Sequence, residues 1–196
     1  MESVLIMGAD EFFGLALCEY MIKEGLQVDL TFMEDDTEQK KQLREERMMW
    51  LGRNDLVRVV NPTMREDVYD LIYIQKEKDN EIQEGIKANI GMFRLLYPSD
   101  HTSTSKQENQ RKGQSILLPA MYGPWTLEED KRYVNDGAYY VEDVAEALFQ
   151  WSLTDNHRQE GIHMLMPQRK TEPAEAKEKI LSWERQNSTI FDKNQE

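Results

Sequence analysis

Cysteine and long apolar runs are scarce in this sequence, and both shortages limit the class of protein. Cys18 is the only cysteine among 196 residues, which excludes an internal disulfide and a zinc site built from several thiolates. No run of ~18 apolar residues occurs, so the sequence predicts no membrane span. Met1 is followed by a short apolar strand without a basic leader. We therefore expect a reducing, cytoplasmic setting.

Basic residues are also outnumbered. The chain has 24 Lys and Arg residues against 37 Asp and Glu residues, a formal net charge of -13. Such a field repels polyanions and anionic lipid surfaces at long range, so neither nucleic acid nor a membrane is expected as a partner. His101, His157 and His163 lie on three different predicted elements without a second ligand at metal spacing. The sequence therefore predicts no metal site.

The first 33 residues predict a βαβ unit. A buried strand from Val4 to Met7 leads into a tight turn from Gly8 to Gly14. A helix follows from Phe13 to Lys23, and a second strand from Gln27 to Met33, in which Asp29 interrupts the apolar alternation. Parallel crossovers of this kind begin an α/β sheet.

The rest of the chain continues this alternation. Strands are predicted at 56–60, 69–74, 116–118 and 162–166, and helices at 37–50, at 80–97, from Val144 to about Leu153, and at 173–186. The helix at 80–97 rests on apolar residues at steps of four, four, three and three, namely Ile82, Ile86, Ile90, Phe93 and Leu96. We predict one Rossmann-like domain over residues 1–190, with a mostly parallel sheet and helices on both faces, and a frayed tail at 191–196.

Two separated motifs resemble one known family. Gly8-Ala9-Asp10-Glu11-Phe12-Phe13-Gly14 looks like a Gly-x-x-Gly-x-x-Gly turn. Leu118-Pro119 with Tyr122-Gly123-Pro124, followed by Tyr140-Val141-Glu142-Asp143-Val144, is similar to Arg-Pro-x-x-x-Tyr-Gly-Pro and Tyr-Val-x-Asp-Val. The chain thus resembles the extended short-chain dehydrogenases, or NAD-dependent sugar epimerases and dehydratases. The resemblance implies a nicotinamide dinucleotide bound across the sheet, a Tyr-x-x-x-Lys acid/base pair and a nucleotide-sugar substrate.

The cofactor-binding positions that the resemblance implies are altered. They are Gly8, Glu11, Phe12 and Gly14 in the turn and Glu34 after the second strand. Glu11 replaces the middle glycine, so it removes the room for a pyrophosphate and adds a negative charge at the helix start. Alternatively, Glu11 points into water and a dinucleotide binds in a shifted pose. Phe32 falls where an acidic residue would grip the ribose, and Glu34 either serves instead or begins the next turn.

The catalytic pair is missing from the sequence. Thr102 to Lys106 matches its spacing with threonine in place of tyrosine, and a threonine hydroxyl lies far from any pKa suited to proton transfer. We therefore predict no catalytic residue. The polar stretch 98–113 is interpreted as a loop that replaces the catalytic strand and helix. Cys18 is expected to be an inert core thiol, and Tyr140 either lines the carboxyl edge of the sheet or packs in the core.

Three hypotheses of function follow. The first is a non-catalytic binding, scaffolding or regulatory module without a cofactor, acting on a protein partner. The second is an NAD(P)-binding or nucleotide-binding oxidoreductase or epimerase-like protein with an atypical site and a small nucleotide ligand. The third is a subunit of a larger assembly, including a homo-oligomer, because lost family elements leave apolar surface.

Overall fold

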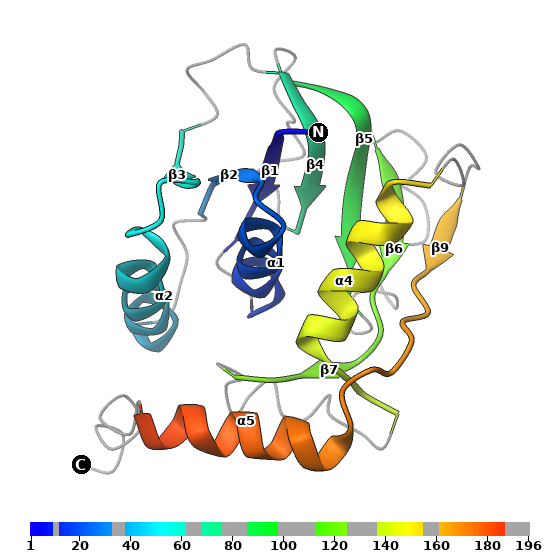
Figure 1. The fold of residues 1–196 in the computed structure, drawn as a ribbon. Coiled ribbons are helices and arrows are strands. Elements are labelled where there is room, and N and C mark those ends of the chain that lie inside the picture. Colours follow the sequence, from blue (N-terminus) through cyan, green and yellow to red (C-terminus); the bar gives the residue numbers. More distant parts are fainter. Residues whose placement is uncertain are drawn as a thin grey trace.

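The centre of the structure is a parallel sheet of seven strands in the order β3-β2-β1-β4-β5-β6-β9 (Figure 1). The computed structural model describes residues 1–9, 12–32, 38–61, 68–75, 86–97, 113–124, 137–154 and 161–186. Its strands are β1 (Ser3–Met7), β2 (Gln27–Leu30), β3 (Val57–Val59), β4 (Val68–Ile74), β5 (Lys87–Leu96), β6 (Gln114–Leu117) and β9 (Ile162–Met164). Every neighbouring pair in this sheet is parallel. The predicted Rossmann-like fold class is confirmed.

The described helices are α1 (Phe12–Lys23), α2 (Glu38–Leu51), α4 (Val141–Ser152) and α5 (Pro173–Gln186). Their positions agree with the sequence prediction to within a few residues. Two short strands, β7 (Met121–Tyr122) and β8 (Tyr139–Tyr140), pair in parallel and were not predicted. Among the described helices, none is long and apolar enough to cross a membrane.

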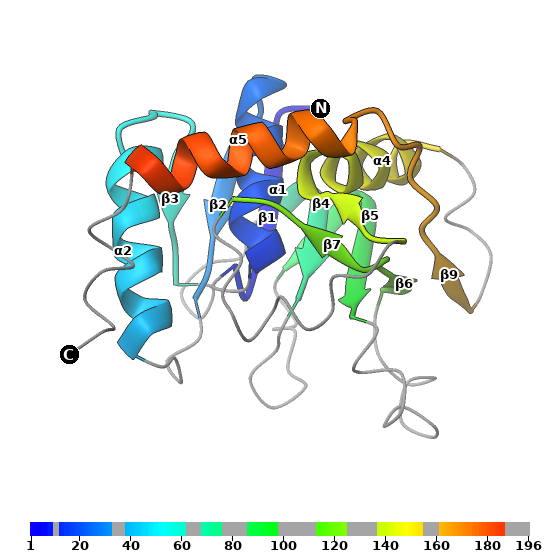
Figure 2. The ribbon, with the colours of Figure 1, turned by 90° about the horizontal axis from the view of Figure 1, so that it is seen from below.

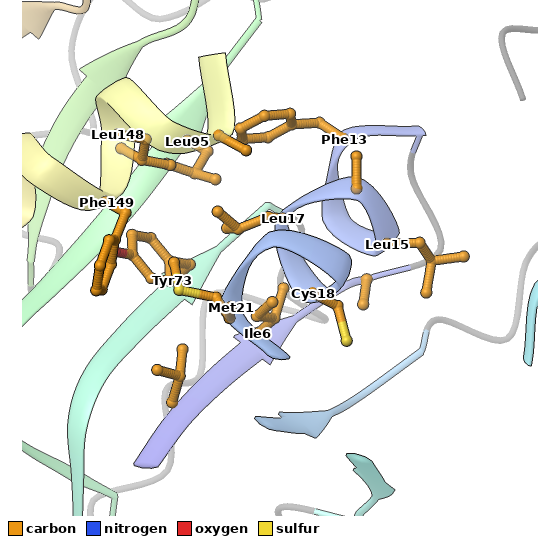
Figure 3. Close-up of a cluster of buried hydrophobic side chains, with 14 of the residues drawn as sticks. Ile6, Phe13, Leu15, Leu17, Cys18, Met21, Tyr73, Leu95, Leu148 and Phe149 are labelled. Carbon is orange, nitrogen blue, oxygen red and sulfur yellow. The ribbon is translucent and has the colours of Figure 1, made fainter. Parts of the chain in front are cut away.

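The main hydrophobic core lies between the sheet and the helices α1 and α4 (Figure 3). Its largest buried side chains include Phe13 and Leu17 of α1, Tyr73 of β4 and Leu148 of α4. The Tyr73 hydroxyl group is 2.7 Å from the Ser152 hydroxyl oxygen, so this phenol is buried with a hydrogen-bond partner. In Figure 2, α1 and α4 lie on one face of the strands. Because α1 packs in this core, its first turn lies next to the residues that follow β1.

A second, smaller cluster lies on the other face of the sheet. Its buried members come only from strands and their flanking residues, namely Leu5, Met7, Tyr69, Ile72, Ile74 and Ile86. In the described part of the chain, no helix residue belongs to this cluster. Helices were predicted on both faces of the sheet, and residues 76–85, which include the start of the predicted helix at 80–97, lie outside the described residues.

The predicted helix at 80–97 is wrong, because residues 87–96 form β5, an inner strand of the sheet. Between Ala88 and Gly91, β5 advances three residues while its partner β4 advances two. Such a bulge inserts one residue and shifts the alternation of side chains along the strand. Ile90 and Phe93 therefore both face the main core across a three-residue step, and that step was interpreted as helical periodicity.

A strand, β5, therefore lies where the sequence pattern predicted a helix. β5 pairs with β4 on one side and with β6 on the other. The interpretation of residues 98–113 as a loop that replaces the catalytic strand and helix stays a prediction. The predicted polar loop at 98–113 lies outside the described residues except for Gly113.

Candidate functional site

The candidate site lies at the carboxyl edge of the sheet, where the strand order reverses between β1 and β4. Parallel α/β sheets bind ligands in the crevice at such a switch point. Gly8, Gln75 and Tyr97 directly follow β1, β4 and β5, so all three residues lie at this edge. Thr31 directly follows β2.

The glycine turn begins at Gly8, which has a φ of 69° and so needs the conformational freedom of glycine. Its N–H donates to Thr31 Oγ1 over 3.2 Å, and the N–H of Ala9 donates to the Thr31 carbonyl oxygen over 2.8 Å. The end of β2 therefore satisfies the first two amides of the turn. Asp10 and Glu11, the next residues of the motif, lie outside the described residues.

Gly14 is the last glycine of the motif, and the surrounding packing leaves no room for a side chain at this position. A Cβ atom at this position would lie 2.2 Å from Gln75 Nε2, 2.8 Å from Ala9 Cα and 2.9 Å from the Ala9 carbonyl oxygen. Cβ atoms in protein structures essentially never approach other heavy atoms to less than 3.0 Å. Close packing of the first turn of α1 against the turn and the end of β4 therefore explains this glycine without a cofactor.

The Gln75 side chain is held over Gly14 by Tyr97. The Tyr97 hydroxyl group donates to Gln75 Oε1 over 2.6 Å. The Nε2 atom of Gln75 is buried and has no acceptor within the described part of the chain. Sequence analysis did not pair these residues, because Tyr97 was assigned to a helix. Tyr97 directly follows β5 at this edge of the sheet.

The ribose end of the expected cofactor site also differs. Phe32, which falls where an acidic residue was expected, packs against the main core. The guanidinium carbon of Arg44 on α2 lies 5.1 Å from the centre of the Phe32 ring, a cation–π distance. Glu34, the alternative acidic residue, lies outside the described residues.

Phe12 joins the glycine turn to the C-terminal motif. A Cβ atom at Gly123 would lie 2.6 Å from Val141 Cγ1 and 3.6 Å from the Phe12 ring. Phe12 itself packs against the main core. The glycine of the Tyr-Gly-Pro segment thus allows close approach of chain segments, and Phe12 has a packing role in the described structure.

Tyr140 is buried, as the core-packing alternative expected. Its ring centre lies 6.0 Å from that of Tyr122, and Lys179 Nζ of α5 lies 5.2 Å from the ring centre. Burial raises the pKa of Tyr140, and the negative charges of Glu142 and Glu19 raise it further. This phenol therefore stays protonated well above neutral pH and is unsuited to be a general base.

Asp143, the aspartate of the Tyr-Val-x-Asp-Val motif, anchors the segment that leads into α5. Its carboxylate accepts the N–H of Lys170 over 3.1 Å, the N–H of Thr171 over 3.0 Å and the Thr171 hydroxyl group over 2.9 Å. Figure 1 shows α5 crossing the end of the molecule below α1 and α4. The motif therefore positions an element of the fold by means of a carboxylate that is only 6% exposed.

A second buried carboxylate, Asp29 of β2, is fully paired. It accepts Arg58 Nε over 2.8 Å, Arg58 Nη2 over 2.9 Å and the Tyr69 hydroxyl group over 2.9 Å. The interrupted alternation of β2 was the sequence signal for this network. These contacts join three strands of the sheet and assign Asp29 a structural role.

Two further reactive side chains, Cys18 and His163, have packing roles in the described structure. Cys18 is fully buried, as predicted, and burial raises the pKa of its thiol from 9.0 to about 12, with a smaller effect of Glu19. His163 packs against Trp151, with ring centres 5.4 Å apart, whereas His101 and His157 lie outside the described residues. Within the described ranges, no group of three or more His, Cys, Asp or Glu side chains is placed to hold a metal ion.

Solved structures with the same fold are sugar-nucleotide enzymes and reductases. Vestitone reductase from alfalfa aligns with a TM-score of 0.63 at 9% identity, over 96% of this chain and 99% of that chain. The dTDP-glucose 4,6-dehydratase of Bacillus anthracis, solved in complex with NAD, aligns with a TM-score of 0.61 at 9% identity, over 97% of this chain and 98% of that chain. UDP-glucuronic acid 4-epimerase from Bacillus cereus, also solved with NAD, aligns with a TM-score of 0.58 at 13% identity, over 83% of this chain and 78% of that chain.

These likenesses show that this chain of 196 residues has a Rossmann-like fold, which it shares with these sugar-nucleotide enzymes and this reductase. No protein-family model matches the sequence. The uncharacterized protein YjaV of Bacillus subtilis (strain 168) is 40% identical over 194 residues, which cover 98% of this chain and 100% of YjaV. The chain belongs to the family of YjaV.

Proposed function

We propose that this chain is a non-catalytic Rossmann-fold protein that acts as a binding, scaffolding or regulatory module in the cytoplasm. The observation that carries the proposal is the packing of Gln75 against Gly14 at the carboxyl edge of the sheet. Two enzymes that share the fold, the 4-epimerase and the 4,6-dehydratase, were solved in complex with NAD. At this edge the Gln75 side chain and the Ala9 backbone contact the first turn of α1 at Gly14. A protein partner is then the expected ligand.

The missing acid/base pair supports the same proposal. None of the eight tyrosines in the sequence is followed by lysine four positions later. Tyr140 is buried with a raised pKa, which makes it a poor replacement. Phe32 offers a ring where an acidic residue would grip a ribose, and Arg44 already lies over that ring. Both the chemistry and the grip on the cofactor are therefore weakened.

A nucleotide-binding function is the second candidate, and one contact favours it. Gln75 Nε2 is a buried donor without an acceptor in the described structure, and an unpaired donor of this kind destabilises the fold by about 1–3 kcal/mol. A phosphate or ribose oxygen of NAD(P) or of a smaller nucleotide would supply the acceptor if the Gln75 side chain turned outward.

Variants that reopen the glycine turn distinguish the non-catalytic function from the nucleotide-binding function. The variants Glu11→Gly and Glu11→Gly with Gln75→Ala remove a charge and a side chain from the expected pyrophosphate position. Because a ligand bound only to the folded state raises the melting temperature, we expect NAD(H) and NADP(H) to stabilise these variants but not the wild type. Thermal melts with and without saturating dinucleotide measure the effect.

The matched control is Glu24→Gly, which makes the same change in charge just beyond the other end of α1. It should gain no stabilisation by dinucleotide. A wild type that is stabilised as strongly as the double variant would contradict the proposal and favour the second candidate.

A further inference from the structure

β9 and the residues directly after it expose an unusual amount of apolar side chain. Ile162 is 42% exposed, Met164 66% and Met166 72%. These residues alternate with His163, which packs against Trp151, and with Leu165, which is buried in the main core. One side of this segment therefore packs under α4, while the other presents three apolar side chains to solvent.

The backbone of β9 is also open on one side. β9 is the last strand of the sheet and pairs with β6, while no other described strand pairs with it (Figure 1). Leu165 donates its N–H to the Leu117 carbonyl oxygen over 3.0 Å, so its backbone points toward β6. Since successive residues of a strand point their N–H and C=O groups to opposite edges, those of Met164 point to the free edge.

The usual protection of an edge strand is missing here. Natural edges carry charged side chains, above all lysine, that discourage pairing with another chain. Residues 161–168 contain no Asp, Glu, Lys or Arg, although 31% of the whole chain is charged. On the opposite edge of the sheet, β3 has Arg58, which is paired with Asp29. Of the two edges of the seven-stranded sheet, only the β9 edge combines unpaired backbone groups, exposed apolar side chains and no charged residue within the described structure.

These features favour a second copy of this chain as the occupant. Two copies each carry a net charge of -13 and repel one another over most of their surface, so they meet most easily where no charge is present. Two β9 strands in antiparallel orientation about a two-fold axis are self-complementary, and such an interface closes on a dimer. Methionine and isoleucine would then face the same residue types across the axis.

We propose that two copies pair through β9 to form one continuous sheet, in which Met164 and its neighbours Ile162 and Met166 are the central contacts. The inference does not depend on the proposed function. A single dimer interface at this edge would leave the carboxyl edge of each subunit open to a partner.

Sedimentation velocity of the full chain at micromolar concentrations tests this proposal. We expect the wild type to sediment as a species of twice 23.1 kDa, and Met164→Lys to weaken the dimer by about tenfold or more. Met49→Lys is the matched control, because Met49 on α2 is 61% exposed and gains the same charge away from β9. Met166→Lys lies beyond the last residue of β9 and gives a second variant with less risk to folding.

Amide hydrogen exchange supplies a readout without any substitution. The Met164 N–H should exchange more slowly as the protein concentration rises, whereas the Leu165 N–H, which is bonded to β6, should not change. A monomeric wild type over the whole concentration range would overturn the proposal. Equal dimerisation of wild type, Met164→Lys and Met166→Lys would overturn it too, as would a dimer that Met49→Lys disrupts to the same extent.

Discussion

Gly14→Ala is expected to lower the free energy of unfolding by about 3 kcal/mol with no cofactor present. The new Cβ atom would lie 2.8 Å from Ala9 Cα and 2.9 Å from the Ala9 carbonyl oxygen, and backbone atoms cannot rotate away as a side chain can. The Gln75 amide group, at 2.2 Å, would have to move as well. Chemical denaturation of purified protein measures the loss directly.

Gly25→Ala is the matched control for this substitution. Gly25 follows α1 with a φ of 79°, but a Cβ atom there meets nothing within 4 Å. Only the backbone conformation opposes alanine, which should cost about 1 kcal/mol. If Gly14→Ala were no worse than Gly25→Ala, the packing account of the motif glycine would be wrong, and room for a ligand would become the better explanation.

Asp143→Ala should destabilise the protein by about 3 kcal/mol or more, because it removes the acceptor for three hydrogen bonds. Two of the donors, the N–H and the hydroxyl group of Thr171, are buried and would lose their partner. The segment before α5 would then be released from α4. Urea denaturation gives the free energy, and amide exchange in α5 should accelerate along with it.

Thr171→Val is the comparison variant for Asp143→Ala. It removes one hydrogen bond and keeps the shape of the side chain and the two backbone bonds to Asp143, so we expect a loss of about 1 kcal/mol. An Asp143→Ala effect no larger than the Thr171→Val effect would contradict the anchoring role of the carboxylate.

The order of most elements could be predicted from local patterns. Strand β1, the glycine turn and α1 have strong signals, because a short apolar run, glycines and an apolar helix face follow one another directly. Helix α5 was predicted with its observed bounds, Pro173–Gln186, since proline favours the first helical turn. Strand β5 was missed, because its bulge disturbs the alternation that identifies strands.

The contacts of the site could not be predicted in the same way. Gln75 and Tyr97 are brought together by the parallel pairing of β4 and β5, a register that no local pattern specifies. The packing that requires Gly14 likewise depends on Gln75 after β4. The structure shows what the Gln75 side chain contacts, namely the Tyr97 hydroxyl group and the first turn of α1.

Calorimetric titration of the wild type tests the central claim that chain atoms close the cofactor edge. NAD⁺, NADH, NADP⁺, NADPH and a panel of nucleotides and nucleotide sugars are the ligands. The account predicts no saturable heat with any of the four dinucleotides, because Gln75 packs against Gly14 and Phe32 takes the place of the ribose acid. Stoichiometric binding of one of them with micromolar affinity would contradict it.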